Sequence, residues 1–211
     1  HDALPILDVA SGAGTQYLSA SNTTWDLNQE WSFFFGRRAQ ALTGANSVEI
    51  WLYATESDLE SATVDGYRLI AGDNAGVDEF ILESVTDGTG TTVLTTTAEI
   101  PNGRTDYGLA FSVTRNGAGD WEVLTSALPV SNGDGVLATD DPRCEATTSR
   151  GTANNTDYTP TGTGYYGLAV THSTGVNGRS TQEFDQFLFT SNSAGCDDNT
   201  ACNYIAGSDD S

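Results

Sequence analysis

The sequence has very little positive charge. It contains no lysine, and its eight basic residues, all arginine, stand against 29 acidic residues, for a formal net charge of −21 at pH 7. Because phosphates and anionic headgroups are repelled by so acidic a chain, nucleic acids and anionic membrane surfaces are poor candidate partners. The same charge suits salty water, where screening weakens self-repulsion, and suits the binding of hard cations. Composition therefore favours a saline extracellular setting over the cytosol.

Long apolar runs and histidines are also scarce. No stretch reaches the roughly 18 apolar residues that a membrane-spanning helix needs, so we expect no membrane insertion. Residues 1–14 lack the basic start and apolar middle of a signal peptide, which favours a mature or excised segment. His1 and His172 have no paired spacing for zinc and no nucleophile motif around them. The sequence therefore offers no Ser-His-Asp arrangement and no zinc site.

Alternating apolar and polar residues, rich in aromatic and β-branched types, run through most of the chain. This pattern predicts strands at 30–38, 47–54, 66–72, 79–85, 91–97, 107–115, 120–126, 165–172 and 182–190. Turn sequences such as DGTG, RNGAGD and SNGDG separate them, and the segment FSVTRNGAGDWEVLT (111–125) is predicted to form a hairpin. The one helix candidate, 55–63, is short and predicts a turn. About ten short strands without helices favour an all-β, two-sheet antiparallel jelly-roll sandwich over an immunoglobulin domain.

One long segment, 127–164, shows little alternation and is rich in Thr, Asn, Asp and Gly. A connection of this length in a compact domain is usually functional or disordered. Within it, residues 134–143 are expected to form an irregular edge strand.

The order of the segments adds a resemblance. SNTTWDLNQEWSFFF, VEIWLYA, DGYRLIAGDNAGVDEFIL, YGLAFSVTRNGAGDWEV and GYYGLAVTHSTGVNGRSTQEFDQFLF follow one another along the chain. Together they resemble the concanavalin A-like, laminin G-like jelly rolls of large secreted proteins of marine Bacteroidetes. The resemblance covers roughly residues 15–190 and implies a jelly-roll domain over residues 1–192.

The C-terminal segment GCDDNTACNY, followed by DDS, resembles the GCTDPTACNYNPSANVDDGSC repeat of the same bacterial proteins, with Asn199 where the repeat has proline. The resemblance implies that residues 193–211 begin an acidic, Cys-containing repeat or linker, and that further domains belong to the same polypeptide. It also implies export by the type IX route and display on the cell surface or release. A Cys196–Cys202 disulfide is possible in an oxidising compartment, but a partner beyond residue 211, or Cys144, competes with it.

Two groups of oxygen ligands are candidates for Ca²⁺, which binds carboxylates, amides and carbonyls. The first lies in GDNAGVDEF, where Asp73, Asn74 and Asp78 surround a glycine-containing turn. The alternative there is an ordinary polar hairpin turn. The second lies in the tail and comprises Asp197, Asp198, Asp209 and Asp210. The alternative there is a solvated acidic linker.

Aromatic side chains supply a candidate glycan site. Trp51 and Tyr53 face away from the aliphatic side of their strand, and exposed rings on a curved sheet stack on sugars in many lectins. Glu49 beside them could accept hydrogen bonds from sugar hydroxyls. The alternative is a second buried layer beneath loops. Tyr158 and Tyr165, near the long segment, form a second aromatic group with the same two interpretations.

The segment QEFDQFLF matches part of a hydrolase motif. Laminarinase-type glucanases share the jelly-roll fold and carry Glu-x-Asp-x-x-Glu on their catalytic strand. Glu183 and Asp185 match the first two positions, but Leu188 stands at the third, and retaining hydrolysis needs two partnered carboxyls. The sequence therefore predicts no enzyme. It predicts a glycan-binding or adhesion module, with a polysaccharide or cell-surface glycan as partner; a structural spacer or assembly domain of a stalk or filament is the alternative.

Overall fold

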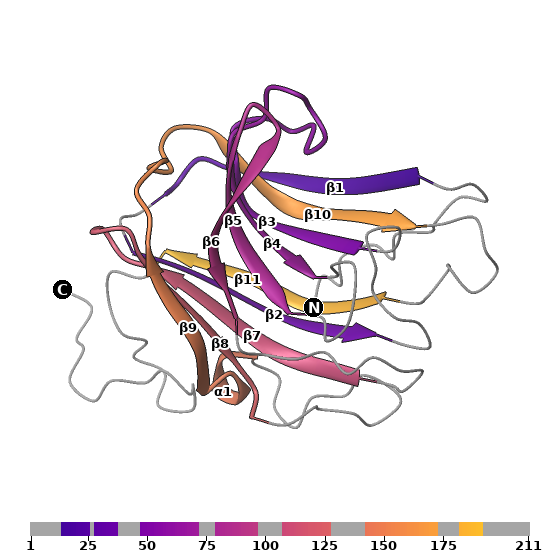
Figure 1. Cartoon of the computed structure of the whole chain (residues 1–211), viewed down its shortest axis with the longest axis vertical. Coiled ribbons are helices and arrows are strands. Elements are labelled where there is room, and N and C mark those ends of the chain that lie inside the picture. The colour runs from indigo at the N-terminus through magenta and orange to yellow at the C-terminus, as the bar shows by residue number, and fades with distance from the viewer. Residues whose placement is uncertain are drawn as a thin grey trace.

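The described part of the protein is a sandwich of two antiparallel sheets. The computed structural model describes residues 14–25, 28–37, 47–71, 79–96, 107–127, 142–172 and 182–191. Within these ranges the chain forms eleven strands and one four-residue helix. Figure 1 shows the two sheets lying face to face as two layers. The predicted all-β, two-sheet architecture is confirmed for these residues.

One sheet has six strands in the order β1-β10-β3-β4-β5-β6. Its members are β1 (Gly14–Asn22), β10 (Gly164–His172), β3 (Ser47–Ala54), β4 (Gly66–Ala71), β5 (Phe80–Thr86) and β6 (Thr89–Thr95). The other sheet has five strands in the order β11-β2-β7-β8-β9. Its members are β11 (Gln182–Ser191), β2 (Gln29–Arg37), β7 (Tyr107–Arg115), β8 (Asp120–Thr125) and β9 (Thr148–Asn154). Successive strands often lie in different sheets, as β1, β2 and β3 do, so the chain crosses repeatedly between the two layers.

The main core lies between the sheets and follows from strand alternation. Trp31, Phe33 and Phe35 of β2 are buried, and Val48 and Ile50 of β3 meet them from the opposite layer. Aromatic stacking adds to area burial, which contributes about 1.5–3 kcal/mol for each large side chain. The rings of Phe33 and its cross-strand neighbour Phe111 are stacked with centroids 5.0 Å apart.

A second, smaller core covers the outer face of the six-stranded sheet. Trp51 of β3 and Val85 of β5 pack there against Leu59 and Val64, which come from the connection between β3 and β4. That connection consists of bends and turns, as predicted for 55–63. The loop thus acts as a lid of apolar side chains over one outer face.

Two hairpins follow the turn chemistry of the sequence. β5 and β6 are joined by Asp87 and Gly88, both with positive φ (47° and 68°), as a two-residue hairpin turn requires. β7 and β8 form the predicted hairpin, closed by hydrogen bonds between Asn116 and Asp120. Gly119 in that turn has φ of 80°.

Two strands and the short helix escaped prediction. β1 and β9 are edge strands rich in Ser, Thr, Gly and Asn, so hydrophobic alternation is weak in both. The long segment 127–164 contains β9 and the helix α1 (Pro142–Glu145), which contacts β2 and β7. The predicted edge strand 134–143 lies mostly outside the described residues. In the described part of the chain, no helix is long and apolar enough to cross a membrane.

Candidate functional site

The outer face of the five-stranded sheet carries a row of polar side chains across four neighbouring strands. Backbone register places Glu30 of β2 beside Thr114 of β7, Thr114 beside Glu122 of β8, and Glu122 beside Thr152 of β9. These four residues, called the first row below, alternate with Trp31, Val113 and Val123 of the core, so they point outward. Two carboxylates and two hydroxyls therefore project side by side from one surface.

The first row keeps much of its hydrogen-bonding capacity. One carboxylate oxygen of Glu30 accepts a 2.7 Å hydrogen bond from the buried Ser112 hydroxyl, which orients the side chain. In the described part of the chain, the carboxylate of Glu122 has no hydrogen bond or ion pair. The row therefore offers strong acceptors to a ligand, flanked by hydroxyls that both donate and accept.

A hydrogen-bonded cluster lies beside the first row at the β7–β8 hairpin. The carboxylate of Asp120 accepts bonds from the side-chain amides of Asn116 (2.9 Å) and Asn154 (2.7 Å). The bond from Asn116, followed by that from Asn154, lowers the pKa of Asp120 below its ordinary value. Asn28 approaches from the start of β2 and accepts a bond from the Gly117 N–H (3.3 Å). We call Asn28, Asn116, Asp120 and Asn154 the hairpin cluster.

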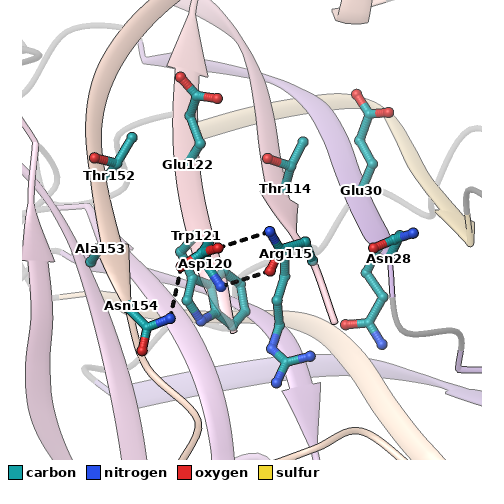
Figure 2. A pocket seen from close by; sticks show the side chains of 12 residues that line it. Asn28, Glu30, Thr114, Arg115, Asp120, Trp121, Glu122, Thr152, Ala153 and Asn154 are labelled. Carbon is teal, nitrogen blue, oxygen red and sulfur yellow. Dashed lines mark hydrogen bonds between the residues drawn. The ribbon is translucent and has the colours of Figure 1, made fainter. Parts of the chain in front are cut away.

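The first row and the hairpin cluster line a hollow of about 700 Å³. Figure 2 shows Glu30, Thr114, Glu122 and Thr152 pointing to the same side, with Asp120 and Asn154 joined by a hydrogen bond. The other end of this sheet face is filled, because Phe34 and Ala110 also alternate with core residues and yet are buried. Since α1 contacts β2 and β7, we infer that it covers this end. The hollow is the part of the face left open.

Arg115 also lines the hollow but belongs to the interior. It is only 3% exposed, and its guanidinium lies over the ring of Trp121, 5.7 Å from the centroid. One nitrogen donates to the carbonyl oxygen of Tyr158 (3.2 Å). Its Nε is buried and has no hydrogen-bond partner among the described residues. Arg115 is adjacent to the outward-facing Thr114 on β7 and so lies on the core side of the strand, and this donor belongs to the interior and not to the open face of the hollow.

The structure corrects the expectation of exposed aromatic rings on β3. Trp51 is fully buried and Tyr53 is 5% exposed, so neither ring can stack on a sugar. Trp51 belongs to the second core, and a register shift between Trp51 and Tyr53 turns Tyr53 toward Trp25, whose ring it meets edge-on at 5.0 Å. The alternative interpretation, a second buried layer beneath loops, describes Trp51 correctly.

Glu49 is engaged within the protein. Arg68 of β4 lies between Glu49 and Glu83, with 2.9 Å ion pairs to both carboxylates. Glu49 also accepts a 3.2 Å bond from the Trp51 indole N–H. Burial raises the pKa of the Glu49 carboxyl, although Arg68 and Trp51 act in the opposite direction. This side chain orders the outer face of the six-stranded sheet.

Tyr158 and Tyr165 are half-buried and pack against different cores. Tyr158 packs against the main core, and its hydroxyl is hydrogen-bonded to Thr86. Tyr165 of β10 packs against the second core, on the outer face of the six-stranded sheet. The two rings are not part of the hollow, and whether either contacts a ligand stays a prediction.

The predicted calcium ligands and disulfide lie outside the described residues. This holds for the loop group, Asp73, Asn74 and Asp78, and for the tail group, Asp197, Asp198, Asp209 and Asp210. It holds equally for Cys196 and Cys202. Within the described ranges, no group of three or more His, Cys, Asp or Glu side chains is arranged to hold a metal ion.

The segment QEFDQFLF lies in β11, an edge strand of the five-stranded sheet. Glu183 pairs with Gly36 and Asp185 with Phe34, and a register shift follows between Asp185 and Leu188. The prediction of no enzyme stays a prediction.

Comparisons with known proteins identify the fold. No family model matches the sequence, and no curated protein matches it. Among solved structures, the carbohydrate recognition domain of Emp47p is similar with a TM-score of 0.58 at 10% identity, over 83% of this chain and 76% of that one. The globular domain of T. cruzi calreticulin is similar with a TM-score of 0.50 at 9% identity, over 87% of this chain and 72% of that one. The predicted concanavalin A-like jelly-roll fold is confirmed.

Sequence reasoning missed the hollow because its members are dispersed. Glu30, Thr114, Glu122 and Thr152 come from four strands spread over most of the chain, and none belongs to a motif. β9, which carries Thr152, was not predicted, so the register that aligns the row was hidden. The usable signal was the predicted hairpin 111–125, in which alternation alone places Thr114 and Glu122 on the outward face.

Proposed function

We propose that this chain is a non-enzymatic glycan-binding module and that the hollow is its binding site. The observation that carries the proposal is the first row, in which two carboxylates and two hydroxyls share one open face with the amides of the hairpin cluster. Sugars present closely spaced hydroxyls that both donate and accept, so a surface of mixed donors and acceptors complements them. The fold that this chain shares with the Emp47p carbohydrate recognition domain supports the same proposal by analogy.

The hollow suits a ligand that brings many hydrogen-bonding groups. The carboxylates of Glu30 and Glu122 accept only, Thr114 and Thr152 donate or accept, and the side-chain amide of Asn28 can donate. In the described part of the chain, no exposed aromatic ring lines the hollow. Recognition would therefore depend on hydrogen bonds and shape, and we expect modest affinity for a single sugar and stronger binding of an extended chain.

The test is calorimetric titration with a panel of soluble oligosaccharides, comparing wild type with the double variant Thr114→Ala/Glu122→Gln. A hydrogen bond to a charged group contributes about 1.5–3 kcal/mol, so we expect affinity to fall about tenfold or more. Glu60→Gln is the matched control, since Glu60 is exposed on the loop over the opposite sheet. Equal affinity of all three proteins for every bound oligosaccharide would place the site elsewhere and overturn the proposal.

We propose an exported, cell-surface or released setting for the module, as part of a longer polypeptide of Bacteroidetes type. The net charge of −21 and the resemblance of residues 193–211 to an acidic Cys-containing repeat support this. In this proposal, residues 1–192 form the jelly-roll domain and residues 193–211 begin the repeat. Mass spectrometry of the purified chain under non-reducing conditions would test the Cys196–Cys202 disulfide that this setting permits.

We propose that the loop between β4 and β5 binds Ca²⁺ through the side chains of Asp73, Asn74 and Asp78. Support comes from the sequence, because two aspartates and an asparagine lie close together in the segment GDNAGVDEF and Ca²⁺ binds carboxylate and amide oxygens. A cation that binds only the folded protein must raise its melting temperature. We expect a higher Tm in Ca²⁺ than in excess chelator, and loss of that difference in Asp73→Asn/Asp78→Asn; a Ca²⁺ shift that persists in this variant would assign the ion to another site, such as the tail.

A further inference from the structure

The charges that line the hollow are unequal. Three carboxylates, Glu30, Asp120 and Glu122, are set against one guanidinium, Arg115. Asp120 is held ionised, because the bonds from Asn116 and Asn154 lower its pKa. The ligand that fits this surface must tolerate, or benefit from, net negative charge.

The single positive charge is turned away from the first row. Figure 2 shows the Arg115 guanidinium pointing to the opposite side from the carboxylates of Glu30 and Glu122. Its other contacts, the Trp121 ring and the Tyr158 carbonyl, hold it within the interior. Arg115 therefore does little to neutralise the face that a ligand meets.

The two glutamates of the first row are separated by one strand. Glu30 and Glu122 lie on β2 and β8, both in register with Thr114 on the intervening β7. Strands in a sheet are about 4.8 Å apart, so the backbones of the two glutamates are about 10 Å apart. That separation is close to the repeat of two linked sugar rings, and the Thr114 hydroxyl stands between the two carboxylates.

We propose that the hollow prefers a glycan whose sugars carry protonated amines, such as a β-linked glucosamine oligomer, over its N-acetylated form and over anionic glycans. This proposal rests on the proposed function and names the ligand class of the same site. Each ammonium group would donate charge-assisted hydrogen bonds to Glu30 or Glu122, and these bonds are stronger than neutral ones. Uronic-acid and sulfated sugars are anionic and would be repelled by the carboxylates of the hollow and by the net charge of −21 of the chain.

A simple polyamine matches the hollow less well than an amine-bearing sugar. The hollow is also lined by hydrogen-bond donors, namely the hydroxyls of Thr114 and Thr152 and the side-chain amide of Asn28. Donors of this kind need acceptor oxygens, which sugar hydroxyls and ring oxygens provide and a polyamine lacks. The combination of carboxylates and donors therefore indicates a sugar with amines.

The experiment titrates the folded protein with three oligomers of equal length: glucosamine, N-acetylglucosamine and a uronic acid. Wild type is compared with Glu30→Gln/Glu122→Gln, and with Glu60→Gln/Glu56→Gln, which removes the same charge from the loop over the opposite sheet. We expect wild type to bind the glucosamine oligomer about fivefold more tightly than the N-acetylated one, because two exposed ion pairs contribute about 0.4–2 kcal/mol together. The preference should disappear in Glu30→Gln/Glu122→Gln, persist in the control, and shrink in about 0.5 M salt.

The outcomes separate the two proposals. If no oligomer binds, the proposed function fails. If the N-acetylated oligomer binds at the hollow as tightly as the amine form, or the uronic-acid oligomer binds more tightly, the amine preference is wrong and the glycan-binding function stands. Equal weakening of glucosamine binding by the hollow and the control variants would show general attraction to an acidic surface and would also overturn the inference.

Discussion

Arg115 and Tyr67 belong to opposite sheets and meet at the backbone of Tyr158. The Arg115 guanidinium donates to the Tyr158 carbonyl (3.2 Å), and the Tyr67 hydroxyl accepts from the Tyr158 N–H (3.0 Å). The same hydroxyl donates to the side-chain oxygen of Asn155 (2.7 Å). The loop after β9 is thereby tied to both layers at the end of the sandwich beside the hollow. This junction keeps Arg115 turned inward and so preserves the acidic face of the first row.

Replacing Tyr67 by Phe should weaken this junction. The variant leaves the Tyr158 N–H without its partner and removes one of the two bonds to the Asn155 side-chain oxygen, which keeps the bond from the Asp157 N–H. An unpaired buried polar group costs about 1–3 kcal/mol. We expect the free energy of unfolding in urea to fall by about that amount. Tyr17→Phe is the control, because Tyr17 is 41% exposed on the edge strand β1. This substitution should change the free energy of unfolding by less than about 0.5 kcal/mol. Equal stability of the two variants would show that the junction contributes nothing.

Trp51 should behave as a core residue. Its ring is fully buried, with the Arg68 guanidinium 5.5 Å from its centroid. Trp51→Ala should lower the free energy of unfolding by about 3–5 kcal/mol, as for other large-to-small changes in cores. Trp51→Phe keeps an aromatic ring and should fold and retain glycan affinity, measured by the same calorimetry. A folded Trp51→Phe protein that has lost glycan binding would return the site to β3.

Two glycines with positive φ provide a matched pair. Gly119 (φ 80°) and Gly162 (φ 67°) both adopt a conformation that costs an L-residue about 1 kcal/mol. A Cβ at Gly119 would lie 2.7 Å from the Asn155 carbonyl oxygen, whereas a Cβ at Gly162 would meet nothing within 4 Å. Gly119→Ala should therefore lower the free energy of unfolding clearly more than Gly162→Ala in parallel urea titrations. The reverse order would mean that the hairpin turn relaxes without resistance from the Asn155 loop.

The elements that sequence reasoning located are those with strong alternation. β2, β3 and β7 carry large apolar residues at every second position, and burial of one face explains that pattern directly. β1 and β9 are edge strands whose polar residues show no such alternation. Their strand structure depends on pairing with the neighbouring strands β10 and β8, which the sequence pattern does not show. The prediction of an exposed Trp51 was wrong because alternation separates the two faces of a strand but does not show which face other residues cover. The loop that carries Leu59 and Val64 covers the face on which Trp51 lies.

The pH dependence of stability should carry a signature of Glu49. Burial raises its pKa above the ordinary value of 4.5, and Arg68, which is shared with Glu83, offsets this only in part. The folded protein thus binds more protons than the unfolded chain between the unfolded and folded pKa values, and Glu49 contributes stability at low pH that is lost as pH rises through its folded pKa.

Glu49→Gln removes this titration while keeping an acceptor for the Trp51 indole and leaving Arg68 paired with Glu83. The free energy of unfolding of the variant, relative to wild type, should therefore rise from pH 4.5 toward neutrality, as followed by urea unfolding at several pH values. Glu60→Gln should change this dependence less than Glu49→Gln does, because the charge of Glu60 is the smallest of the causes that act on the pKa of Glu49. A relative stability that falls as pH rises would mean that attraction to Arg68 outweighs burial, and that Glu49 titrates as an ordinary ion-paired carboxylate.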